Sequence, residues 1–149
     1  MYSVMYYIIK NMSDKLSFII KNGSSYIDGK FQKIDLAVSD GKIKKIGKID
    51  TKRGEVFDAT GKIVLPGAID TQVHFREPGL THKAEIFTES MAAVAGGVTT
   101  YMEMPNTIPN ATTIHELEKK YDIAKRKSFA NYSFYLGATN NNMHELNIG

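Results

Sequence analysis

The rhythm of hydrophobic and polar positions changes near residue 66 and divides the chain into two parts. Residues 16–66 contain short apolar runs separated by the turn dipeptides Asn22-Gly23, Asp28-Gly29 and Asp40-Gly41. Glycine and its Asn or Asp neighbour tolerate positive φ, so these dipeptides predict hairpins. We therefore expect a small antiparallel β portion over residues 16–66, preceded by a tail over residues 1–15 for which disorder is one option.

Residues 67–149 instead alternate strand and helix patterns over a longer distance. The predicted strands end near residues 74, 104 and 137, with helical patterns between them. The step of about 30 residues is what a (β/α)₈ barrel of ~250 residues gives when divided by eight. Doubly wound sheets use units of similar size, so the period alone leaves both folds open. No G-x-G-x-x-G loop follows these strands, which disfavours dinucleotide binding.

The two helical patterns differ in how clearly they begin. The first is predicted over residues 81–95, with an apolar stripe made of Phe87, Met91, Val94 and Ala95. The second begins with a capping-box pattern, Thr113 and Glu116. Its predicted inner stripe is Ile114, Leu117, Tyr121 and Ala124, and the residues predicted to face solvent are Lys119, Lys120, Arg126 and Lys127.

Composition narrows the class of protein. The chain has 149 residues, 42% hydrophobic and 23% charged, with a formal net charge of +3. Its lysines are scattered without interleaved aromatic residues, so we expect no nucleic-acid partner. Cysteine is absent, which excludes disulfides, thiol catalysis and Cys-ligated zinc. The apolar start, residues 1–9, is too short to span a bilayer and lacks the marks of a signal peptide, so we expect a cytoplasmic protein without a membrane partner.

Polar side chains gather where the predicted strands end. In a strand over residues 67–75, alternation places Asp70, Gln72, His74 and Arg76 on one face. Asn106 follows the second strand, and parallel α/β folds bind ligands at this edge of the sheet. The planar fork of Arg76 suits a carboxylate, and Asn106 could donate to the same anion.

Each of these residues also has a simpler interpretation. Arg76 could pair with Glu77 or Glu85 at the surface, and Asn106 could serve only its turn. Glu103, inside the second strand, remains open between a buried ion pair and a position at the rim.

Three motifs carry a resemblance to a known family. They are Gly67-Ala68-Ile69-Asp70 through Val73-His74-Phe75-Arg76-Glu77-Pro78-Gly79, then Ala95-Gly96-Gly97-Val98-Thr99-Thr100, and Met104-Pro105-Asn106-Thr107. Together they resemble the dihydroorotases of the amidohydrolase superfamily, whose relatives include allantoinases and dihydropyrimidinases. The resemblance extends from about residue 16 onward. It implies an α/β fold: the N-terminal part of a (β/α)₈ amidohydrolase barrel, with about three strands over residues 67–149, preceded by part of an accessory β-sandwich over residues 16–66.

The resemblance also implies roles for individual residues. The family's first strand usually ends in His-x-His, two ligands of a zinc centre; here His74 holds the second place and Gln72 the first. Gln72 is therefore expected either as a ligand or as a structural residue, and it makes a two-metal centre less favourable. Arg76 and Asn106 match residues that hold the substrate carboxylate, and Asp70 matches a structural acid. The remaining ligands and the catalytic aspartate are expected beyond Gly149.

The implied activity is zinc-dependent hydrolysis of a cyclic amide, the interconversion of dihydroorotate and N-carbamoyl-L-aspartate in pyrimidine biosynthesis. Because most of the site is missing, we expect no turnover from the 149-residue chain alone and a need for a complementing chain or an oligomer. The alternatives are an allantoinase-like hydrolase, or a non-catalytic remnant or interaction subunit of a dihydroorotase and carbamoyltransferase assembly.

Overall fold

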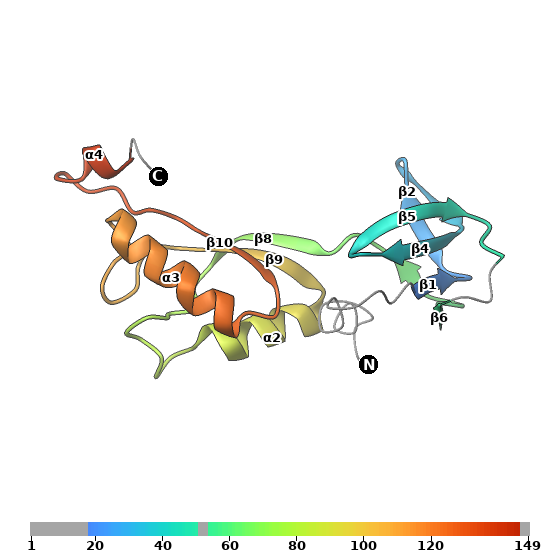
Figure 1. The fold of residues 1–149 in the computed structure, drawn as a ribbon, viewed down its shortest axis with the longest axis horizontal. Helices are drawn as coiled ribbons and strands as arrows, with labels where there is room; N and C mark the ends of the chain where they lie inside the picture. Colours follow the sequence, from blue (N-terminus) through green and yellow to red (C-terminus); the bar gives the residue numbers. More distant parts are fainter. Residues whose placement is uncertain (1–17, 51–53, 147–149) are drawn as a thin grey trace. The chain divides into compact units, whose positions relative to one another are not determined.

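The computed structural model describes residues 18–50 and 54–146, so the predicted tail over residues 1–15 lies outside the described residues (Figure 1). The chain divides at Pro66 and Gly67 into two compact units. The N-terminal unit holds the strands β1 (Phe18–Lys21), β2 (Ser24–Ile27), β3 (Lys30–Lys33), β4 (Asp35–Ser39), β5 (Lys42–Gly47), β6 (Glu55–Asp58) and β7 (Ile63–Val64). The C-terminal unit holds β8 (Ala68–Val73), α2 (Ile86–Gly96), β9 (Val98–Glu103), α3 (Ile114–Lys127), β10 (Asn131–Phe134) and α4 (Met143–Leu146).

The N-terminal unit consists of two sheets around a small core. One sheet has the order β5-β4-β1-β6 and the other β3-β2-β7. Ile20 and Leu36 of the first sheet pack with Ala59, and side chains of the second sheet, including Ile27 and Val64, close over them. Burial of these apolar faces against each other stabilises the unit, as in other two-sheet packings.

The turns of this unit correct part of the sequence prediction. Asp28-Gly29 and Asp40-Gly41 have positive φ at both residues and connect the hairpins β2–β3 and β4–β5, as predicted. Asn22 also has positive φ, at 64°, but it leads from β1 into β2 of the other sheet, so a hairpin there is wrong. Moreover, β1 pairs with β6 and β2 with β7 in parallel, so the unit is mixed rather than purely antiparallel.

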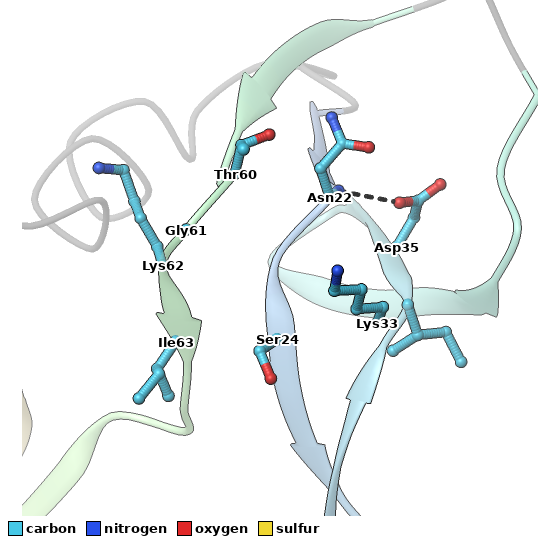
Figure 2. Close-up of a pocket in the computed structure, with 9 residues that line it drawn as sticks. Asn22, Ser24, Lys33, Asp35, Thr60, Gly61, Lys62 and Ile63 are labelled. Carbon is cyan, nitrogen blue, oxygen red and sulfur yellow. Dashed lines mark hydrogen bonds between the residues drawn. The ribbon is translucent and has the colours of Figure 1, made fainter.

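A hollow of about 540 Å³ lies at the side of β2 and β7 in this unit (Figure 2). Its acidic side chain, Asp35, already accepts the backbone N–H groups of Asn22 and Ile49, both at 3.2 Å. The Asn22 amide donates to Asp58 at 3.0 Å, and this bond lowers the pKa of Asp58. Asp35 and Asn22 of the hollow therefore already hold the backbone and side chains of the neighbouring turns.

The C-terminal unit is a parallel sheet covered by helices. Its strand order, β10-β9-β8, follows the chain without reversal. Helix α2 packs against β9, α3 packs against β10, and the two helices contact each other. Among the described strands there is thus no switch point, which the doubly wound alternative requires. Tyr101 of β9 is fully buried, with its ring 4.4 Å from that of Phe75 between centroids.

Helix α3 confirms the capping prediction and corrects the predicted solvent face. The Thr113 hydroxyl accepts the backbone N–H of Glu116 at 3.2 Å. However, the buried residues of the helix are Lys120 and Ala124, and the Lys120 side chain is only 1% exposed. The prediction that Lys120 faces solvent is therefore wrong.

Helix α2 begins later than predicted and buries a different stripe. It starts at Ile86 rather than near residue 81, and its buried residues are Ile86, Ser90 and Val94. Phe87 and Met91 remain exposed, at 43% and 38%. The buried residues are spaced four apart along the helix, so they lie on one face. Phe87 and Met91 each follow a buried residue by one position and therefore lie on the neighbouring, exposed face.

Among the helices of the described chain, none has the length and apolar character needed to cross a membrane.

Candidate functional site

The site predicted at the end of the first strand is built around a β-bulge. Asp70 lies opposite Tyr101 and Val73 opposite Glu103, so three steps along β8 match two along β9. The Asp70 carboxylate accepts the freed N–H of Gln72 at 3.0 Å, and the Tyr135 hydroxyl donates to the Thr71 carbonyl at 3.0 Å. The regular alternation predicted over residues 67–75 is therefore wrong, because the bulge changes which residues share a face.

His74 and Asn106 come together from the loops that follow β8 and β9. The distance between His74 Nδ1 and Asn106 Oδ1 is 2.9 Å. An amide oxygen only accepts, so Nδ1 carries the proton and the lone pair of the neutral ring is on Nε2. Both residues are exposed, so Nε2 of His74 and the amide nitrogen of Asn106 are open to a ligand.

Arg76 follows in the same loop with an unusual backbone. Its φ is 65°, in the left-handed region that is costly for a residue with a side chain. Within the described ranges its guanidinium makes no ion pair, and the two acids considered as surface partners, Glu77 and Glu85, pair with Lys127 instead. The surface ion pair suggested for Arg76 is thus wrong, and its five donors remain open to a ligand.

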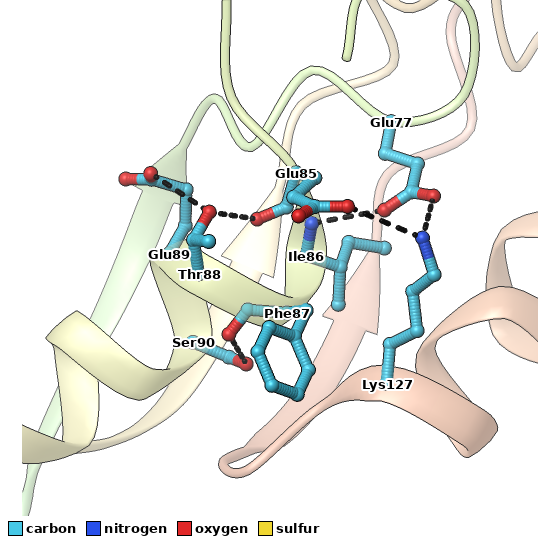
Figure 3. A network of polar contacts seen from close by, with 8 residues as sticks. All are labelled: Glu77, Glu85, Ile86, Phe87, Thr88, Glu89, Ser90 and Lys127. Atoms are coloured by element: carbon cyan, nitrogen blue, oxygen red, sulfur yellow. Dashed lines mark hydrogen bonds and ion pairs between the residues drawn. The ribbon is translucent and has the colours of Figure 1, made fainter.

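Glu77 fixes the other side of this loop (Figure 3). Its carboxylate accepts the backbone N–H of Ile86 at 3.0 Å and pairs with Lys127 Nζ at 2.6 Å. The hydrogen bond with Glu77 raises the pKa of Lys127. Helix α2 thus begins on a carboxylate nine residues earlier in the chain, which explains why no local capping signal marks its start.

The loops after β8 and β9 also pack directly on each other. The backbone N–H of Ile108 donates to the Pro78 carbonyl at 3.2 Å. Gly79 has φ +82°, and a Cβ there would lie 2.6 Å from the Cβ of Ile108 and overlap its carbonyl oxygen. Only glycine permits this approach, so the backbone itself joins the loop of Arg76 to the loop of Asn106.

Sequence reasoning missed the partner of Glu103 in the buried ion pair beneath these loops. Lys120 Nζ lies 3.2 Å from Oε2 of Glu103, and each side chain is 1% exposed. Of the two interpretations left open for Glu103, the buried ion pair is therefore correct and the position at the rim is wrong. Lys120 lies three residues after Leu117 and four before Ala124, so its place on the inner stripe was visible in the helical period.

The described residues do not by themselves fit a zinc site. Zinc in proteins takes about three protein ligands and a water. His74 offers Nε2 and Gln72 is exposed near it in the chain, but the Asp70 carboxylate is engaged with the bulge. Across residues 18–50 and 54–146, no group of three His, Asp or Glu side chains could hold a metal. Gln72 and His74 as metal ligands therefore stay predictions.

Comparisons with known proteins find relatives that match most of this chain. The family model described as dihydro-orotase-like matches residues 61–143, which include β8, the bulge and both loops. The chain is 41% identical over 124 residues to a dihydroorotase of Methanosarcina mazei, which is 82% of this chain and 27% of that protein. It is also 41% identical over 128 residues to a dihydroorotase of Lactobacillus acidophilus, covering 86% of this chain and 30% of that one.

A solved structure gives a similar result. An L-hydantoinase (dihydropyrimidinase) from Arthrobacter aurescens matches with a TM-score of 0.79 and 31% identity, over 88% of this chain and 30% of that one. This chain thus spans 27–30% of the length of these relatives. The family model covers more than half of the chain and the resemblance predicted from its motifs is confirmed: the chain belongs to the dihydro-orotase-like family.

Proposed function

We propose that this chain supplies the substrate-carboxylate part of the active site of a dihydroorotase-like cyclic amide hydrolase. The observation that carries the proposal is the Arg76 guanidinium, which forms no ion pair with any described residue and lies two residues after a histidine that is bonded to Asn106. A guanidinium without an acidic partner, in a loop with a costly backbone conformation, is typical of a binding residue.

Dihydroorotate fits this chemistry because it carries a carboxylate on a ring that contains a cyclic amide. Arg76 would accept the carboxylate with two parallel N–H bonds. Asn106 would add its amide nitrogen, since its oxygen is held by His74. Hydrolysis then adds one water across the ring C–N bond and gives N-carbamoyl-aspartate, whose carboxylate remains on the same two residues.

The residues that activate water belong, in this proposal, to protein outside this chain. The relatives are more than three times as long as the part that matches. The remaining strands of a (β/α)₈ barrel would close on β8 and β10, and the zinc expected for the family would draw most of its ligands from them. A separate complementing chain, a cytoplasmic location and a role in pyrimidine biosynthesis stay predictions, as do the allantoinase-like and interaction-subunit alternatives.

A hydantoinase-like activity is the second candidate, favoured by the similarity to the Arthrobacter aurescens enzyme. Hydantoin itself has a cyclic amide but no carboxylate. The two candidates therefore differ in whether Arg76 matters for binding.

The test is a hybrid enzyme in which this chain replaces the matching 124 residues of the Methanosarcina mazei dihydroorotase. We expect the hybrid to hydrolyse dihydroorotate, and Arg76→Ala to raise its KM about 10- to 100-fold through loss of charge-assisted hydrogen bonds. Arg126→Ala, which removes an exposed arginine of α3, is the matched control and should leave the KM unchanged.

Equal KM values in the two variants would contradict the role of Arg76. Hydrolysis of hydantoin that is indifferent to Arg76→Ala, without activity on dihydroorotate, would favour the second candidate. The 149-residue chain alone, loaded with zinc, should show no turnover, and measurable turnover would overturn the assignment of water activation to other protein.

A further inference from the structure

Two charged side chains lie buried directly beneath the loops of the candidate site. Glu103 is at the end of β9 and Lys120 is on α3, and their ion pair spans 3.2 Å. Lys120 Nζ also donates to the Met104 carbonyl at 3.0 Å and lies 5.0 Å from the centre of the Phe134 ring. Buried ion pairs add little stability compared with apolar side chains of the same size, because desolvation offsets their attraction. Stability alone therefore does not explain this pair.

Glu103 lies opposite Val73 in the pairing of β8 with β9, so its buried side chain lies near the start of the loop that carries Arg76. Burial raises the pKa of Glu103, while Lys120 and the backbone N–H groups of Arg76 and Phe75 lower it. Neither oxygen of Glu103 completes a hydrogen bond of ordinary geometry. The carboxylate thus acts on these N–H groups mainly through its charge, which is effective at such a buried position.

Arg76 has a left-handed backbone conformation, which is costly without contacts that hold it in place. A residue with φ 65° persists only when its surroundings determine it. The Arg76 carbonyl is held from the other side by the backbone N–H of Leu80 at 3.1 Å. On the N–H side lies the buried carboxylate of Glu103, whose pKa the Arg76 N–H lowers.

Lys120 contacts the second loop through a hydrogen bond. Its ammonium group holds the carbonyl of Met104, two residues before Asn106. One buried pair therefore touches the backbone of both loops that present the proposed carboxylate ligands.

We propose that Glu103 and Lys120 are positioning residues: Glu103 fixes the left-handed backbone of Arg76, Lys120 fixes the chain before Asn106, and their ion pair keeps the two loops in register for one carboxylate. The value of this arrangement for binding rests on the proposed function. The coupling of the pair to the backbone of Arg76 does not.

The test replaces the pair by apolar residues in the full 149-residue chain, as Glu103→Leu/Lys120→Met. Apolar replacement of both partners leaves no buried unpaired charge, so the fold should survive. We expect hydrogen exchange of the Phe75 and Arg76 amides to become about tenfold faster, since a charge-assisted contact is lost. The HN–Hα coupling of Arg76, which reports φ, should move away from its left-handed value.

Ser90→Ala is the matched control. It removes a polar contact of another fully buried side chain, the one between the Ser90 hydroxyl and the backbone N–H of Phe129, without touching either loop. The coupling of Arg76 should stay unchanged in this variant.

Glu103→Gln provides the second variant if the double variant does not fold. It keeps the size and one acceptor oxygen but not the charge, so we expect faster exchange at Arg76 than in the unchanged chain. Unchanged exchange and coupling at Arg76 in whichever of these variants folds would overturn the proposal. A uniform change over the whole sheet would also overturn it, because it would show a role in stability alone.

These measurements contain no substrate, so they separate the two proposals. Suppose that Arg76→Ala leaves the KM of the hybrid enzyme unchanged, but the exchange and coupling of Arg76 change in the Glu103 variants. The proposed function then fails and the positioning role stands. If Arg76→Ala raises the KM, but the exchange and coupling of Arg76 do not change when the pair is replaced, the proposed function stands and the positioning role fails.

Discussion

Asn106 presents its two side-chain polar atoms to different partners. Its oxygen binds Nδ1 of His74, and its amide nitrogen has no hydrogen-bond partner among the residues that the structure describes. A single asparagine can therefore select the tautomer of the histidine and still donate to a ligand. From the sequence, the same residue was interpreted only as a substrate ligand or a turn former.

Asn106→Ala should release the ring of His74. Loss of a hydrogen bond worth about 1 kcal/mol would change the ratio of its two neutral tautomers about fivefold in favour of the Nε2–H form. The ¹⁵N chemical shifts of the ring nitrogens in the full chain measure this ratio. His82 is the internal control, since it is exposed and outside the pair, and identical His74 shifts in both proteins would disprove the selection.

At the scale of elements, the sequence correctly predicted those turns and helix ends that depend on residues close together in the chain. The hairpin at Asp28-Gly29 and the start of α3 at Thr113 depend on residues a few positions apart, and both are confirmed. The order of strands and helices after residue 66 follows from periodicity and is also as expected.

Contacts between distant residues could not be predicted in this way. The start of α2 depends on Glu77, and the β8 bulge depends on pairing with β9 and on Tyr135, 64 residues from Thr71. The burial of Lys120 depends on a carboxylate in another element. For the site, the sequence placed His74 and Asn106 at the same sheet edge, but not their bond or the backbone conformation of Arg76.

The contact between the two site loops gives a prediction for Gly79. Gly79→Ala should destabilise the fold by about 3 kcal/mol or more, because the new methyl group adds overlap with Ile108 to the cost of positive φ. Gly29→Ala is the control, since Gly29 also has positive φ, at 77°, but nothing within 4 Å of a Cβ. It should cost only about 1 kcal/mol.

Denaturant unfolding of the two variants measures both values. The steric part of the effect is their difference. Equal destabilisation would show that Gly79 is needed for its backbone angle alone and that the two loops can separate without cost.

At the scale of the whole molecule, the described sheet of the C-terminal unit has an open edge. Among the described strands, β8 has a neighbour only at β9, and Ile69 within it is 65% exposed. A strand edge with unpaired backbone groups and an exposed apolar side chain is a site for pairing with another chain. We therefore expect the 149-residue chain to self-associate along β8.

Ile69→Lys should reduce this self-association and leave the unfolding free energy within about 0.5 kcal/mol, because the side chain is exposed. Light scattering over a range of protein concentrations measures the effect. Ile108→Lys, a similar change at a 59% exposed loop residue, should leave the association as it is. An equal decrease in both variants would assign the effect to net charge rather than to the edge of β8.

The left-handed backbone of Arg76 has a consequence for how this site can change. At φ 65° glycine would be the less strained residue, yet glycine cannot bind an anion through a side chain. Stability and recognition therefore favour different residues at position 76. Selection for a more robust protein alone would favour glycine there and lose the guanidinium, so an engineered library screened only by heat would drift away from the function it was meant to preserve.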